Sequence, residues 1–118
     1  MTTQDLKSRT KAFALRVIKL TDSLPRSRSA NVIGWQLLRA ATSVGANYRA
    51  TQRTRSHKDF LSKLGVVEEE ADECCYWLEL LADSEPVKPA RLADLRREAD
   101  ELTAIMVASI RTAKRKKP

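Results

Sequence analysis

The chain has 118 residues, of which 42% are hydrophobic and 31% are charged, with three Gly and four Pro. This balance excludes a disordered or collagen-like chain and favours one helical domain, large enough for a continuous core without metal or disulfide staples. The net charge of +7 adds a preference for acidic or polyanionic partners.

The charge is distributed in three blocks along the chain. Residues 1–63 carry thirteen Lys or Arg against three Asp or Glu, whereas residues 64–110 carry four against twelve. Residues 111–118 carry five basic residues and no acid. This pattern predicts an electrically polarised molecule. Such a molecule either binds polyanions or pairs its own oppositely charged faces across a subunit contact.

The first half of the chain predicts two helices. Residues 3–24 place apolar side chains at helical spacing, and Pro25 with the Arg/Ser stretch after it ends the pattern. Ser29 is the expected N-cap of a second helix, which frays near Thr54. Gly45 lies inside this second helix and Gly65 inside the next, where we expect both to permit close approach of neighbouring helices.

The second half predicts two more helices. Ser56 and Asp59 resemble a capping box that opens the third helix, and residues 84–89 form a loop before a fourth helix that starts at Pro89. The expected fold is all-α: one up-down-up-down antiparallel four-helix bundle over residues 1–110. Residues 111–118 lose the apolar stripe, so we expect a frayed or disordered basic tail.

The inventory of reactive groups does not indicate an enzyme, a metal site or a cofactor. His57, the single histidine, lies among cations, and no nucleophile has an activating context. Cys74 and Cys75 are adjacent, which is not the spacing of a zinc pair, so we interpret them as small buried hydrophobes. No signal peptide or membrane-spanning run is present, which predicts a cytoplasmic protein that does not enter a membrane.

The outward faces of the second and third helices combine apolar and charged side chains. The second helix presents an indole among arginines, and the third presents acids with a tyrosine, a composition typical of interfaces. We expect a head-to-tail contact between neighbouring copies, which closes a ring if the rotation allows. The alternative is that both are solvated faces with incidental aromatics. The predicted oligomer contact comprises Trp35, Leu38, Arg39, Arg49, Glu69, Glu73, Tyr76 and Leu80.

The remaining cations form a candidate nucleic-acid surface. Phosphate binding requires clustered cations rather than a motif, and no element for reading bases is recognisable, so we expect binding of RNA or DNA through the backbone. For the tail, a solubilising terminus is an equal alternative. The predicted set comprises Arg26, Arg28, Arg53, Arg55, Lys58, Lys63, Arg111, Lys114, Arg115, Lys116 and Lys117.

The central region resembles a known bacterial family of four-helix bundles. The segment Gln36–Tyr48, followed by Arg53, Ser56, Phe60, Leu64 and then Glu73 ahead of Tyr76–Leu78, carries this resemblance. The first-described members are encoded in intervening sequences of large-subunit ribosomal RNA genes. The family is related to the accessory variability determinant of diversity-generating retroelements. This chain departs from the pattern at Ala50-Thr51, where many members have an acidic residue, often followed by Gly.

The resemblance implies a homopentameric ring and, for the retroelement relatives, a basic surface that engages nucleic acid and a reverse transcriptase. Two functions remain open. One is a ring-forming accessory protein that binds RNA. The other is a structural or interaction module that assembles with itself or a protein partner, with charge serving solubility and assembly.

Overall fold

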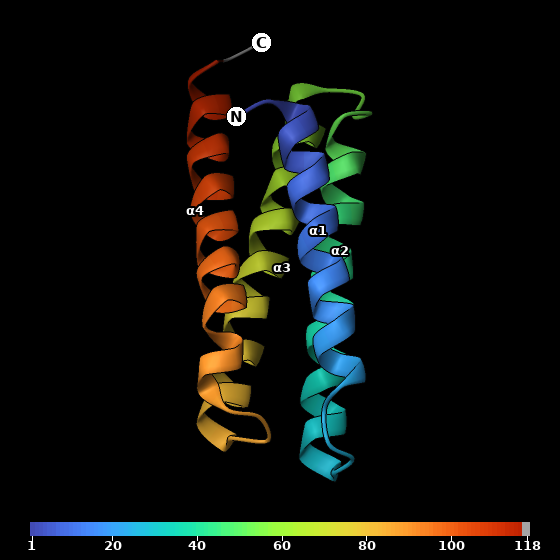
Figure 1. Ribbon diagram of the computed structural model, residues 1–118. Coiled ribbons are helices and arrows are strands. Elements are labelled where there is room, and N and C mark those ends of the chain that lie inside the picture. Colours follow the sequence, from blue (N-terminus) through green and yellow to red (C-terminus); the bar gives the residue numbers. More distant parts are fainter. Residues whose placement is uncertain (117–118) are drawn as a thin grey trace.

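The computed structural model describes residues 1–116, which form four α-helices and no strand. These are α1 (Thr3–Asp22), α2 (Arg28–Thr51), α3 (His57–Ser84) and α4 (Ala93–Arg115), with a 3-10 turn, η1 (Pro89–Leu92), ahead of α4. Figure 1 shows the helices running alternately up and down in a rod of 49 × 21 × 20 Å. The predicted all-helical class and four-helix arrangement are confirmed.

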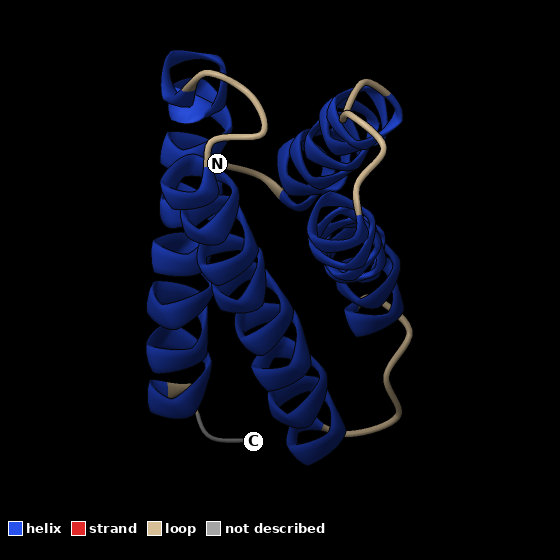
Figure 2. Cartoon of the chain, turned by 90° about the horizontal axis from the view of Figure 1, so that it is seen from below, coloured by secondary structure: helices blue, strands red, loops and turns tan. Residues whose placement is uncertain are grey.

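The helices pack in chain order around one core. α2 packs against both α1 and α3, and α4 packs against α3, whereas contact between α1 and α4 is sparse. Figure 2, seen along the bundle, shows α1 and α4 as the outer members. Fully buried Phe13, Leu37, Leu78 and Met106 represent all four helices in the core. Burying each such side chain contributes about 1.5–3 kcal/mol, so the apolar stripes drive assembly of the bundle.

An ion pair spans the sparse side between α1 and α4. Arg9 Nε donates to Glu98 Oε2 at 2.7 Å, and Arg9 Nη2 donates to Glu98 Oε1 at 2.6 Å. This two-bond geometry raises the pKa of Arg9, because the carboxylate hydrogen-bonds to its charged form. The pair therefore supplies a directional link where apolar contact is limited.

Side-chain caps set the starts of α1, α2 and α3. Thr2 and Asp5 form a reciprocal capping box at α1, and Ser56 Oγ accepts from the Asp59 amide at 3.0 Å at α3. The prediction of Ser29 as the cap of α2 is wrong. Ser27 Oγ accepts from the Ala30 amide at 3.1 Å, so α2 begins at Arg28 and Ser29 is already helical.

The predicted tail differs from the structure. α4 continues to Arg115, and Ala113 is buried, so the first residues of the 111–118 segment belong to the last helical turns. The apolar stripe continues from Met106 through half-buried Ile110 to Ala113, at helical spacing. Lys117 and Pro118 lie outside the described residues.

Gly45 and Gly65 have different surroundings. A Cβ on Gly45 would lie 3.6 Å from the Thr10 backbone, an ordinary van der Waals distance, so a methyl group there would pack against α1. A Cβ on Gly65 would meet nothing within 4 Å. The expectation of close helix approach is therefore wrong for Gly65.

Candidate interaction surfaces

Cations from separate parts of the sequence meet at one end of the bundle. Figure 1 shows the α2–α3 connection at the same end as the last turns of α4. A cavity of about 380 Å³ lies between α3 and α4 there, with His57 and Lys116 among its lining residues. We call this region the basic end. Its cations from the predicted nucleic-acid set are Arg53, Arg55, Lys58, Lys63, Arg111, Lys114, Arg115 and Lys116.

The side chains of the basic end are mostly exposed, and Lys63 is half-buried. No ion pair involves any of them in the described part of the chain. Adjacent like charges without partners repel one another, and binding an anion relieves that repulsion. The arrangement therefore suits a polyanion that spans the α2–α3 connection and the end of α4.

The fold separates two members of the predicted nucleic-acid set from the others. Arg26 and Arg28 lie at the α1–α2 connection, which Figure 1 shows at the opposite end of the rod. Lys117 lies outside the described residues. The set thus divides into a basic end and a distant arginine pair.

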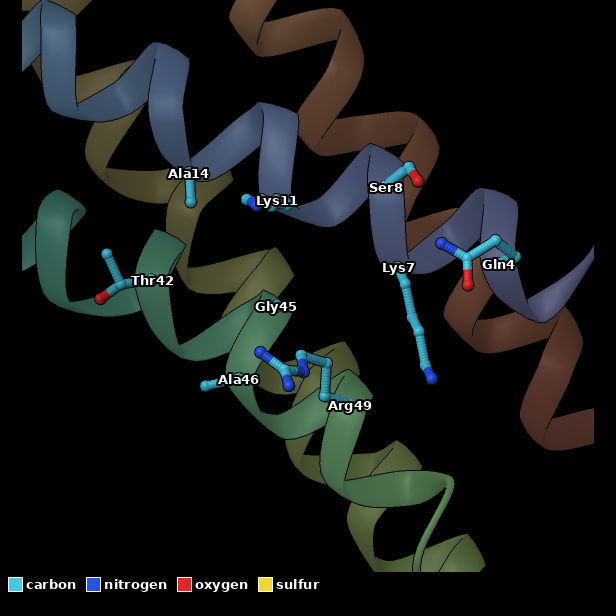
Figure 3. A pocket seen from close by; sticks show the side chains of 9 residues that line it. All are labelled: Gln4, Lys7, Ser8, Lys11, Ala14, Thr42, Gly45, Ala46 and Arg49. Atoms are coloured by element: carbon cyan, nitrogen blue, oxygen red, sulfur yellow. The ribbon is translucent and has the colours of Figure 1, made fainter.

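A groove between α1 and α2 carries cations that the sequence reasoning missed. Lys7 and Lys11 from α1 face Arg49 from α2 across a cavity of about 560 Å³ (Figure 3). Arg49, which belongs to the predicted oligomer contact, lines this groove. The i, i+4 spacing of Lys7 and Lys11 was a signal that could have placed both on one face of a helix.

Arg39 and Glu73, predicted to pair neighbouring copies, contact each other within one chain. Arg39 Nη2 lies 2.7 Å from Glu73 Oε1, and Arg39 Nη1 lies 3.1 Å from Glu70 Oε2. Trp77 Nε1 donates to the same Glu73 oxygen at 3.1 Å. The hydrogen bond from Arg39, followed by that from Trp77, holds the pKa of Glu73 below its ordinary value. This cluster, the α2–α3 clasp, joins the middle of the two helices.

The clasp changes how the predicted oligomer contact is arranged. α2 and α3 are antiparallel neighbours, so Trp35, one turn before Arg39, and Trp77, one turn after Glu73, lie on the same side of the ion pair. Trp35, Arg39, Glu73 and Tyr76 thus border one composite ridge along α2 and α3, whereas Arg49 lies in the α1–α2 groove. The head-to-tail contact between neighbouring copies stays a prediction.

Large apolar side chains remain uncovered on this ridge. Trp35 is 64% exposed and Tyr76 is 52% exposed. The rings of Tyr76 and Trp77 pack edge to face, with their centroids 5.1 Å apart. Glu69 is also exposed, whereas Leu38 and Leu80 are half-buried. Leu38 packs against the core, which gives it a role within the bundle. Trp35 and Tyr76 are therefore the large exposed aromatic side chains of this ridge.

The thiols are not placed for chemistry. Cys74 is buried, and Cys75 is half-buried with its Sγ 3.7 Å from Thr103 Oγ1. Burial raises the pKa of both thiols, that of Cys75 to about 11. At neutral pH both are protonated and poorly nucleophilic.

Residues 1–116 contain neither a candidate metal site nor a candidate membrane-spanning helix. No group of three or more His, Cys, Asp or Glu side chains there could hold a metal ion. Within the same residues, no helical segment has the length and hydropathy needed to cross a bilayer.

Comparison with known proteins relates the whole bundle to one family. Residues 3–108 match the model of the 23S rRNA-intervening sequence protein family. A crystal structure of a protein of unknown function, from the S23 ribosomal protein family of Bacteroides thetaiotaomicron, is 31% identical. The similarity covers 94% of this chain and 99% of that chain, with a TM-score of 0.86. No curated protein matches the chain. The chain therefore belongs to the 23S rRNA-intervening sequence protein family.

Proposed function

We propose that this protein is a non-enzymatic accessory protein that assembles with itself and binds RNA through the basic end. The observation that carries the proposal is the convergence of cations from the α2–α3 connection and the end of α4, none of which has an ion pair within residues 1–116. Counterions released from RNA phosphates by such a cluster supply affinity without base recognition. The binding should therefore tolerate changes of sequence and weaken steeply with salt.

The family adds a reason to test RNA first, because its name refers to intervening sequences of 23S rRNA. The resemblance to the retroelement accessory determinant extends the proposal to a reverse transcriptase as protein partner and to DNA as a second polyanion. A homopentameric ring is the proposed assembly, since it would repeat the basic end around an axis and raise avidity. The cytoplasm is the proposed location.

The test compares two pairs of arginines at opposite ends of the rod. Arg53→Gln with Arg55→Gln removes two charges from the basic end, and Arg26→Gln with Arg28→Gln removes the same charge from the other end. Binding to a structured RNA is measured by fluorescence anisotropy over a series of salt concentrations. We expect about tenfold weaker binding for the first pair and a salt slope reduced by about 1.5, since each lost phosphate contact removes roughly 0.7–0.9.

The control pair should bind within about twofold of the wild type, because its charges lie far beyond a Debye length of roughly 8–10 Å. Equal losses of RNA affinity in both double variants would show that binding depends on net charge alone, and would refute the basic end as the binding site. A protein that assembles but does not bind RNA at low salt would instead favour the alternative function, a module that assembles with itself or with a protein partner.

The contribution of the cations in the last turns of α4 is tested by substitution rather than by truncation. Removal of residues after Ile110 would also remove buried Ala113 and a helical turn. Lys114→Gln with Arg115→Gln removes charge while the helix remains, and we expect a loss similar to that of the Arg53 and Arg55 pair.

A further inference from the structure

The groove between α1 and α2 is distinct from the basic end in position and in lining. Its walls are successive turns of α1 and α2, and Figure 3 shows Lys7, Lys11 and Arg49 bordering the same hollow. Lys7 is half-buried, whereas Lys11 and Arg49 are exposed. No carboxylate lines the groove, and none of the three cations has an ion-pair partner among residues 1–116.

The other lining residues narrow the chemistry of an occupant. The floor is built from small residues, Ala14, Gly45 and Ala46, so nothing large occupies the hollow. Gln4 and Ser8 add neutral donors along the α1 wall. The described residues that line the groove include no aromatic side chain to stack on a base and no large apolar side chain to anchor a peptide. The groove offers charge and hydrogen bonds, and little else.

Phosphate is the anion that best matches these groups. An Arg guanidinium donates two parallel hydrogen bonds to phosphate oxygens, and Lys supplies a compact point charge. A cavity of about 560 Å³ has room for more than one phosphate. The two lysines are one turn apart on α1, so they would flank neighbouring phosphates rather than share one.

We propose that the α1–α2 groove is a phosphate-binding site. The phosphates come from an RNA strand that continues from the basic end or from a free phosphate compound; the first source rests on the proposed function, and the second does not. Arg53, four residues beyond Arg49 and just past the end of α2, connects the groove with the basic end along the chain.

The experiment removes two charges from each side of α1. The groove variant, Lys7→Gln with Lys11→Gln, removes both lysines that line the groove. The control variant, Arg16→Gln with Lys19→Gln, removes the same charge from residues that line a different cavity, next to α4. None of the four side chains has an ion-pair partner in the described residues, so both variants should fold. Circular dichroism checks this before binding is measured.

Two probes distinguish the sources of phosphate. A uridine oligonucleotide is titrated by anisotropy over a salt series. Inorganic pyrophosphate is titrated by NMR, with the Arg49 Nε–H signal as the reporter. We expect the groove variant to bind the oligonucleotide about tenfold more weakly, with a salt slope lower by about 1.4, and the Arg16 and Lys19 control to match the wild type.

The possible results separate the two proposals. A pyrophosphate shift at Arg49 without oligonucleotide binding would support the groove with a free phosphate compound and refute RNA binding. Oligonucleotide binding that is unchanged in the groove variant, with no shift at Arg49, would overturn the groove and leave the basic end standing. Equal losses in both variants would also overturn it, because net charge alone would explain them.

Discussion

The glycines differ in how much space the surrounding structure leaves for a side chain. A Cβ on Gly34 would lie 2.9 Å from Leu24 Cδ1, so a larger residue there would displace that methyl group. A Cβ on Gly45 would meet the Thr10 backbone at an ordinary distance, and Gly65 has open space around the position of its missing Cβ. A helical glycine in open space reduces stability without a packing benefit.

Gly65→Ala should therefore raise the free energy of unfolding by about 0.5–1 kcal/mol, because Ala is the better helix former and restricts the unfolded chain. Urea denaturation followed by circular dichroism should show a higher midpoint with an unchanged slope. Gly34→Ala is the comparison, and its gain should be smaller because Leu24 must move. A destabilised Gly65→Ala protein would show that another surface covers this position.

At the scale of helices, the boundaries show what periodicity can and cannot predict. Four apolar stripes predicted four helices, because burial of a stripe dominates helix formation in a bundle. The start of α2 was predicted two residues late, because Ser29 was predicted as the cap although Ser27, the same residue type, stands two residues earlier and caps the helix. The end of α4 was missed because Ala113 is small and counts weakly in a stripe, although it is buried.

The α2–α3 clasp should make stability depend on pH. The pKa of Glu73 is lowered in the folded state, so its ionised form stabilises the fold above the ordinary value of 4.5. This contribution is lost as the pH falls from 4.5 through the lower pKa of the folded protein. Glu73→Gln should be less stable than the wild type at pH 7 and should lose less stability on acidification.

Urea denaturation at pH 7 and at successive values below 4.5 measures this difference. Glu69→Gln is the matched control, because it removes an exposed carboxylate one turn away that has no ion pair in the described residues. A Glu73→Gln profile parallel to that of the wild type would show that the clasp does not contribute to stability.

For the whole molecule, the arrangement of the candidate surfaces could not be read from each helix alone. Arg39 and Glu73 both point outward on their own helices, but a helical wheel does not show which neighbour borders an outward face. Because α2 and α3 are adjacent, the two side chains meet within one chain. The basic end was similarly hidden, since residues 53–58 and 111–116 are distant in sequence.

Self-assembly should depend on Trp35 more than on Arg39. Arg39→Glu would bring a third carboxylate against Glu70 and Glu73 and would test folding rather than assembly. Trp35→Ser removes a 64% exposed indole and should lower the mass of the particle in light scattering, or raise the concentration needed for assembly about tenfold.

The matched control is Leu15→Ser, which removes a 54% exposed side chain from α1 and should leave assembly unchanged. A Trp35→Ser particle identical to the wild type at all concentrations would exclude the ridge as the contact. A monomeric wild type would exclude the ring itself.

The concentration of cations at one end of a 49 Å rod has a consequence for motion in solution. Near a polyanion, the field exerts a torque on such a rod, and the long axis turns so that the basic end leads. Encounters then become end-on before any contact forms, and the side chains of the opposite end rarely meet the target first. Added salt would randomise this alignment, so it would slow association as well as weaken the complex.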